Sequence, residues 1–515
     1  MAGGECQTTL IEPVCSRTPI MNAKLVNACL NSSSRRQEAL TTARSGQQES
    51  RYLSLLTSAA TTVALGLVVI LSLAGCAHYT VNAPKKSDRA DGYYYRNQKR
   101  ENKPDDILLL LAFSGGGTRA AAFSYGVLEA LRDTTFEVEG KQRRLLDEVD
   151  VISSVSGGSV TAAAYGLYGD RVFDVFEPAF LKRNVERALL GHVLNPVHWP
   201  ALWSPDYGRS DMAAKYYDKI LFKKARFQDL ATNNTPYLVI NGTDLVTGTR
   251  VSFTQDFFDV LDSDLGAYPI SRAVAASSAV PGVLTPITLN NYSGEYPRVP
   301  PPWLIAPYGP NAGAASRQIA ALKLFLNSTN YPYLHLVDGG VSDNLGLRVY
   351  LELLSYLGLN PELLHQGRLE KVRKVIFICV NAYVRDEKSW DHKAKTPRSI
   401  PVAIAADGVT MQNYSADTLA WLAAAIEKLR SSPDLKSKMD FYSIDLSFDQ
   451  FREQSEAAYF LSLPTTFFLK SPVVDGLKAA ARTLLYQNPD FKKLMTDLGA
   501  SPTSLPAGRA GLVKR

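Results

Sequence analysis

Two stretches of the chain join a short apolar run to a glycine-rich turn and then to a helical segment. The run 107–113 precedes a Ser-Gly-Gly-Gly turn at 114–117, and the run 149–153 precedes a Ser/Gly turn at 154–159. Apolar runs of this length are typical of buried parallel strands. Strands that alternate with helices predict an α/β fold with a largely parallel sheet.

The same pattern continues along most of the 515 residues, with further apolar runs at 237–240, 334–337 and 375–380. There is no internal repeat and no clear boundary inside 105–490, so we expect one folded domain there. Residues 77–104 are polar and predict a tether before this domain. Residues 491–515 predict a C-terminal tail.

Composition excludes some classes of protein. The net charge is only +6 and the basic residues are scattered, so the sequence gives no nucleic-acid footprint. The five cysteines form no CxxC pair and show no zinc-ligand spacing. We therefore expect no nucleic-acid partner and no zinc site.

The N-terminal region carries a secretory signal. Arg44 and Arg51 precede an apolar stretch that is densest over 63–73, and small residues follow directly before Cys76. The sequence Leu-Ala-Gly-Cys at 73–76 resembles a bacterial lipobox, whose cysteine accepts a diacylglyceryl group. We expect 51–76 to be a lipoprotein signal with Cys76 as the lipidation site, and a further acyl chain to complete the anchor.

An uncleaved transmembrane anchor is the alternative, because the apolar stretch approaches the ~20 residues that span a bilayer. Either way, residues from 77 onward are expected outside the cytoplasm. Ala77 follows the cysteine, which by resemblance to sorting rules favours the bacterial outer membrane over the inner membrane. The polar extension 1–50 is unusual before a signal peptide and fits a start site placed too far upstream.

Three consecutive glycines, Gly115, Gly116 and Gly117, follow the first apolar run. Their backbone N–H groups can converge on one point and form a nest for negative charge at a helix N-terminus. In acyl transfer such a nest is an oxyanion hole. Arg119 is then placed to steady the loop or the charge.

The glycine loop has two other interpretations. One is a plain structural turn. The other is a dinucleotide fingerprint of the form GxGxxA, which needs an acidic residue at the end of a second strand about 20 residues on. Asp133, Glu137 and Glu139 are in range, but 134–140 makes a poor buried strand.

The second turn contains a candidate nucleophile. Ser154-x-Ser156-x-Gly158 resembles the strand-to-helix elbow that exposes a serine, with Ser154 in place of the first glycine. Ser159 is a rival, but the β-branched Thr161 two residues after it fits a tight elbow badly. We therefore favour Ser156.

The residue that would take the proton of the serine hydroxyl is less obvious. His365 and His392 come late enough in the chain for a triad but lie in loop-like surroundings, and His335 lies inside an apolar strand. Asp338 ends that strand and precedes two glycines, which suggests the carboxyl edge of the sheet where α/β sites form. Burial would have to raise the pKa of this carboxyl for it to act as a base. A turn-forming aspartate is the alternative.

In order and spacing these motifs resemble the patatin-like phospholipases. The segments 241–248, 275–282 and 463–467 agree as well, whereas Ser154 and Ala120 depart from the family's glycines. The resemblance implies a three-layer α/β/α catalytic domain without a metal or other cofactor. It assigns Ser156 as nucleophile, Asp338 as base, the backbone of Gly115–Gly117 as oxyanion hole, and an acyl-enzyme.

The function implied is a lipid acyl hydrolase of the phospholipase A or lysophospholipase type, acting on membrane phospholipid or another lipid ester. One alternative is a non-catalytic envelope lipoprotein that keeps the fold for binding or scaffolding. Another is an esterase or thioesterase with soluble substrates. Trp199, Trp203 and Tyr207 lie in a proline-broken stretch that is either an apolar lid or ordinary packing.

Overall fold

The computed structural model describes residues 81–86, 92–98, 100–101, 103–138, 140–231, 233–294, 300–305, 313–359, 369–385, 394, 399–431 and 439–500. The extension 1–50, the signal 51–76 and the expected lipidation site Cys76 lie outside this part of the chain. Within it, no helix combines the length and the apolar character needed to cross a bilayer.

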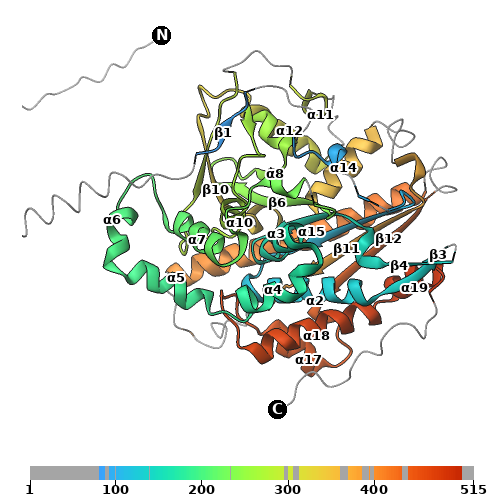
Figure 1. Cartoon of the computed structure of the whole chain (residues 1–515). Coiled ribbons are helices and arrows are strands. Elements are labelled where there is room, and N and C mark those ends of the chain that lie inside the picture. Colours follow the sequence, from blue (N-terminus) through green and yellow to red (C-terminus); the bar gives the residue numbers. More distant parts are fainter. Residues whose placement is uncertain are drawn as a thin grey trace, which may run out of the picture. The chain divides into compact units, whose positions relative to one another are not determined.

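An eight-stranded mixed sheet forms the centre of the domain (Figure 1). Five strands are parallel, in the spatial order β12 (Asp440–Ser447), β11 (Lys374–Asn381), β2 (Ile107–Phe113), β5 (Val149–Val155) and β6 (Tyr237–Asp244). Three are antiparallel to their neighbours: β10 (Tyr333–Asp338), β9 (Ile287–Asn290) and β7 (Arg250–Phe253). The predicted α/β fold with a largely parallel sheet is confirmed.

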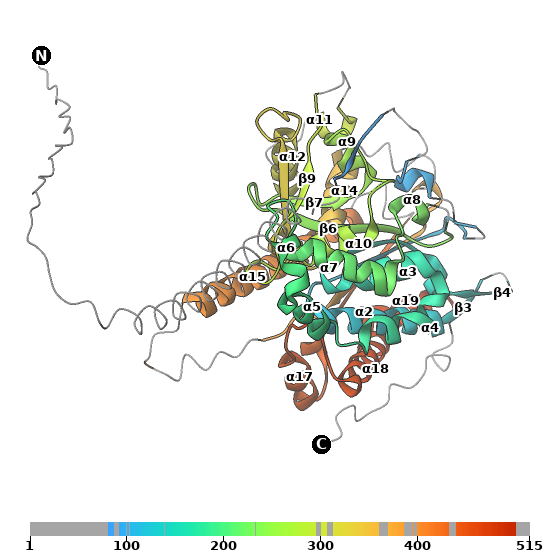
Figure 2. The same ribbon diagram turned by 60° about the vertical axis from the view of Figure 1, so that its left-hand side comes forward.

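Helices cover both faces of this sheet, which confirms the three-layer α/β/α arrangement (Figures 1 and 2). One face carries α2 (Gly117–Asp133), α3 (Gly157–Tyr168), α10 (Ile270–Ser277) and α18 (Ser471–Gln487). The other carries α12 (Gly313–Leu324), α14 (Arg348–Leu359) and α15 (Ser399–Arg430). Shorter helices are α4 (Val172–Phe176), α5 (Val185–Leu194), α6 (Trp199–Leu202), α7 (Arg209–Tyr217), α8 (Phe227–Leu230), α9 (Gln255–Val260), α11 (Pro302–Ile305), α13 (Gly340–Asp343), α17 (Gln454–Leu461) and α19 (Pro489–Asp497).

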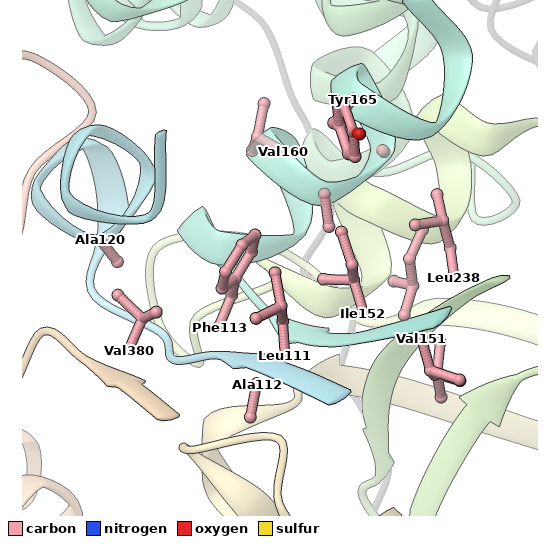
Figure 3. Close-up of a cluster of buried hydrophobic side chains, with 14 of the residues drawn as sticks. Leu111, Ala112, Phe113, Ala120, Val151, Ile152, Val160, Tyr165, Leu238 and Val380 are labelled. Carbon is pink, nitrogen blue, oxygen red and sulfur yellow. The ribbon is translucent and has the colours of Figure 1, made fainter. Parts of the chain in front are cut away.

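The strands are apolar on both faces because both are covered. Figure 3 shows Phe113 and Ile152 directed towards Val160 of α3, whereas Ala112 and Val151 point to the opposite face. All of these side chains are buried. The continuous apolar runs of the sequence are therefore the two-sided interior of the sheet.

Part of the predicted polar tether 77–104 packs on the domain instead. β1 (Ala83–Pro84) pairs with β8 (Ser263–Asp264). The Tyr93 ring stacks on Tyr237 with centroids 4.7 Å apart, and its hydroxyl accepts a hydrogen bond from the Leu238 N–H at 2.8 Å. The free energy gained by burying aromatic rings thus holds this segment on the domain, although many of its other side chains are charged.

The boundary predicted at residue 490 also differs, because it falls inside α19. Phe491 and Leu494 of this helix are fully buried. The predicted tail 491–515 therefore begins with a packed helix, whose apolar residues recur at helical spacing.

The structure disfavours the dinucleotide interpretation of the glycine loop. After α2 the chain forms a two-stranded hairpin, β3 (Thr135–Val138) with β4 (Lys141–Arg144), outside the central sheet. Asp133 ends α2 and Glu137 lies in the hairpin, so neither stands at the end of a second sheet strand. Glu139 lies outside the described residues.

The contact between α2 and α18 gives a stability prediction. A Cβ at Gly126 would lie 2.7 Å from the Lys478 Cα and 2.8 Å from the Ala481 Cβ. We expect Gly126→Ala to lower the free energy of unfolding in urea by about 1–3 kcal/mol through overpacking. At Gly408 of α15 no described atom lies within 4 Å of an added Cβ, so Gly408→Ala should raise stability by about 0.5–1 kcal/mol. A neutral Gly126→Ala would contradict the close packing.

Candidate active site

Ser156 occupies the sharp turn between β5 and α3. Its backbone has φ 50° and ψ −119°, a conformation that non-glycine residues adopt rarely and that costs of order 1–3 kcal/mol. Its N–H donates to Ser277 Oγ at 2.8 Å. Ser159 lies one turn further on, fully buried, with its Oγ 3.0 Å from the same Ser277 Oγ. Ser156 and not Ser159 is therefore the residue at the tip of the elbow.

Close backbone packing surrounds this turn. A Cβ on Gly157 would collide with the carbonyl oxygen of Gly117, and one on Gly158 would lie 2.7 Å from the carbonyl oxygen of Ser114. The N-termini of α2 and α3 can meet only because these positions are glycine. Ser154, which replaces the usual glycine, is fully buried, and its hydroxyl donates to the Val239 carbonyl at 3.4 Å.

Asp338 lies at the level of Ser156 on the other side of β6. Val155 pairs with Asn241 of β6, and Asp338 pairs with Gly242, the next residue of that strand. Neighbouring strands are ~4.7–4.9 Å apart, so Ser156 and Asp338 flank one strand at equal height. Asp338 is the last residue of the strand β10, as predicted, and β10 runs antiparallel to β6.

The tight turn after β10 orients the Asp338 side chain. Its Oδ1 accepts a hydrogen bond from the Gly340 N–H at 2.8 Å. Its backbone N–H donates to the Ala279 carbonyl at 3.0 Å, and its own carbonyl accepts from Thr243 Oγ1 at 2.9 Å. The residue is only 8% exposed, so its carboxyl group is held in a mostly buried position beside β6.

The glycine loop lies beside Ser156, since a Cβ on Gly115 would be 3.4 Å from the Ser156 Cβ. The Gly115 N–H donates to the Asn344 carbonyl at 3.0 Å. Gly116 and Gly117 have positive φ angles of 138° and 60°. In the described structure neither of their amides donates to a backbone carbonyl. Two of the three loop amides are thus without a backbone acceptor among the described residues.

Arg119 joins the glycine loop to two distant segments. Its guanidinium donates to the carbonyls of Ala382 at 2.9 Å and Leu463 at 2.8 Å, and to Thr465 Oγ1 at 3.1 Å. All three acceptors are neutral, and burial lowers the pKa of Arg119 to about 10. The side chain therefore fixes the start of α2 against the residues that follow β11 and α17.

Sequence reasoning gave no role to two residues that shape this site. Ser277 Oγ accepts from the Ser156 N–H and donates to the Asn241 carbonyl at 2.6 Å. Asn344 accepts the Gly115 amide, and its Oδ1 lies 2.5 Å from a Cβ built on Gly115. Both fall in motif segments of the sequence, but only the fold shows what they contact.

The apolar cavity of about 500 Å³ in this domain belongs to the opposite face of the sheet. It is lined by strand residues such as Leu110 and Val151 and by α14 residues such as Leu354. None of Ser156, Asp338 and the glycine loop lines it. Among the described residues there is also no group of three His, Cys, Asp or Glu side chains that could hold a metal ion.

The fold and the serine turn define an α/β protein with a serine at a strand-to-helix elbow. The model of the patatin-like phospholipase family matches residues 111–351, which include Ser156, Asp338 and the glycine loop. The chain therefore carries a patatin-like phospholipase domain. No curated protein matches the chain.

Solved structures match at low identity. Human GIVD cytosolic phospholipase A2 in complex with methyl gamma-linolenyl fluorophosphonate is 13% identical, with a TM-score of 0.37, over 80% of this chain and 61% of that one. VipD from Legionella pneumophila is 12% identical, with a TM-score of 0.27, over 81% and 70%. The same human enzyme with inhibitor and terbium chloride is 15% identical, with a TM-score of 0.27, over 54% of this chain. That match spans 41% of the human chain.

The Ser277 contacts give a testable consequence. Ser277→Ala leaves the Ser156 N–H and the Asn241 carbonyl without their partner, so we expect a loss of about 1–3 kcal/mol in the free energy of unfolding. Ser278→Ala is the matched control, because Ser278 Oγ donates only to the Val274 carbonyl of its own helix, at 2.8 Å. Equal losses in urea unfolding of the two variants would contradict a special role for Ser277.

Proposed function

We propose that this protein hydrolyses carboxylic ester bonds of membrane phospholipids or related lipid esters, as a phospholipase A or lysophospholipase, with Ser156 as nucleophile and Asp338 as base. The observation that carries the proposal is the placement of both residues. Ser156 stands at a positive-φ elbow, and Asp338 stands at the same height across one strand, inside the matched domain. A phospholipase domain makes a lipid ester the fitting substrate.

The first half-reaction forms an acyl-enzyme. Asp338 takes the proton of Ser156 Oγ as this oxygen bonds to the ester carbonyl carbon. The carbonyl oxygen becomes an oxyanion that accepts hydrogen bonds from Gly116 and Gly117, because the Gly115 amide is already bound to Asn344. When the intermediate collapses, the ester C–O bond breaks and Asp338 gives its proton to the leaving alcohol.

The second half-reaction releases the fatty acid. Asp338 takes a proton from water as the water oxygen attacks the acyl carbon, and the proton returns to Ser156 Oγ when the acyl-enzyme bond breaks. Arg119 acts as a positioning residue, since its guanidinium holds the glycine loop through neutral acceptors. In this scheme no step uses a metal or an organic cofactor.

Covalent labelling tests the nucleophile. We expect a fluorescent fluorophosphonate to label the wild-type chain and not Ser156→Ala, because only Ser156 is presented at the elbow. Ser159→Ala is the matched control and should keep labelling, since Ser159 is fully buried. In-gel fluorescence of folded protein measures both. A folded wild type that takes no label, and hydrolyses neither phospholipid nor short-chain esters, would favour the non-catalytic scaffold.

We also propose that the protein is anchored to the bacterial cell envelope, in the outer membrane, through a lipid on Cys76. The support is the basic, apolar and small-residue order that ends at this cysteine. Cys76→Ser should abolish incorporation of radiolabelled palmitate and leave the unprocessed chain. Incorporation that survives Cys76→Ser would contradict lipidation there.

A further inference from the structure

The segment from α5 to α6 exposes an unusual share of apolar surface. Of the sixteen large hydrophobic side chains exposed in the described part of the chain, five lie within residues 190–203, with 41% to 79% of their surface exposed. They are Leu190, Leu194, Val197, Trp199 and Trp203. We call these five residues the apolar patch. Such a concentration of exposed apolar side chains on a folded domain is typical of a surface that binds a protein, a membrane or a ligand.

Helix α5 directs a cation to the same side as the patch. Arg187, Leu190 and Leu194 follow one another at i, i+3 and i+7, which places them along one face of the helix. The opposite face carries Val185 and Leu189, which are buried. The exposed face of α5 therefore carries a positive charge near its N-terminal end, at Arg187, and apolar side chains along the rest of its length.

An open hollow of about 450 Å³ adjoins this face, lined in part by Arg187, His192, Asn195 and His198. The two imidazoles stack with centroids 5.1 Å apart, and His192 Nδ1 donates to the Ala188 carbonyl at 2.7 Å. Arg187 forms no ion pair with any described carboxylate. A guanidinium without an ion-pair partner among the described residues, in a hollow that also contains imidazole and amide side chains, suits a phosphate.

The patch is connected to the serine turn through two packed helices. In Figure 1, α5 and α6 lie beside α7, and α7 packs against α10. Helix α10 carries Ser277, the acceptor of the Ser156 N–H. The start of α7 is also bound to the chain after α10, since Ser210 Oγ donates to the Thr285 carbonyl. A surface that binds the patch is therefore linked to the candidate active site through α7 and α10.

We propose that the segment from α5 to α6 is a membrane-docking element that seats the domain on an anionic phospholipid surface. The apolar patch enters the acyl-chain boundary, and Arg187 contacts lipid phosphate. Two exposed tryptophans, whose rings lie 6.1 Å apart, share this segment with an arginine that has no ion-pair partner among the described residues, which matches the chemistry of a bilayer interface, where indoles and basic side chains concentrate. The inference rests on the proposed function, which requires a substrate held in a bilayer.

Quenching by brominated lipid tests the docking directly. The full chain is used with Ser156→Ala, so that the vesicles are not consumed and the readout does not depend on hydrolysis. Vesicles of bromo-acyl phosphatidylcholine and phosphatidylglycerol at about 7:3 should quench the tryptophan emission. Trp199→Phe with Trp203→Phe should abolish most of this quenching, whereas Trp421→Phe, an exposed tryptophan on α15, should keep it. This control separates the patch from any anchor elsewhere in the chain.

A charge variant tests the phosphate contact. Arg187→Gln should weaken binding to the vesicles with phosphatidylglycerol about fivefold, the effect of one basic side chain near an anionic surface, and leave binding to pure phosphatidylcholine unchanged. Arg317→Gln removes the same charge from the exposed surface of α12 and should have no such effect. Equal weakening by both variants would overturn the assignment of Arg187.

Failure of docking and failure of the proposed function give different results. If docking is right, Trp199→Ser with Trp203→Ser lowers hydrolysis of vesicle phospholipid at least tenfold and leaves hydrolysis of a soluble short-chain ester unchanged. Unchanged quenching in the Phe double variant, or no quenching in the parent chain, overturns the docking proposal. The apolar patch would then bind a protein partner and not a membrane. Loss of both hydrolytic activities in the wild type refutes the enzyme instead.

Discussion

The candidate active site depends on the strained backbone at Ser156. A serine with φ near 50° persists only when its surroundings hold it, and here Ser277 binds its N–H while Gly157 and Gly158 let α2 and α3 close around it. The same closure brings the glycine loop against the Ser156 side chain. The cost of the turn is thus offset by close packing, and the geometry of the site follows from that packing.

The second constraint is the register of β6. This strand pairs with parallel β5 on one side and antiparallel β10 on the other. Reversal of chain direction at β10 places Asp338 beside Gly242, level with the serine turn. A uniformly parallel sheet would have required a different connection to bring a carboxylate there. The mixed sheet is therefore part of how the two residues come to lie at the same level on either side of β6.

The central strands and the helices that follow them could be predicted from the sequence because their signals are local. A continuous apolar run before a glycine turn indicates a covered strand and a following helix, as β2 and β5 are. Strand direction is not a local property, so the residues of β10 do not reveal that it runs antiparallel to β6. The Gly115 amide is likewise taken by Asn344, 229 residues later, which no pattern around the glycines could reveal. The packing of the N-terminal segment could not be predicted either, because the Tyr93 ring stacks on Tyr237, which is distant in the sequence.

In the proposed mechanism Ser156 attacks the ester carbonyl while the Gly116 and Gly117 amides hold the oxyanion. A crystal structure of the full chain inactivated by a lipid fluorophosphonate measures this directly. We predict phosphorus bonded to Ser156 Oγ, a phosphonyl oxygen ~2.7–3.1 Å from both amide nitrogens, and the Asp338 carboxylate beside the adduct. An adduct on another residue, or a phosphonyl oxygen directed away from Gly116 and Gly117, would contradict it.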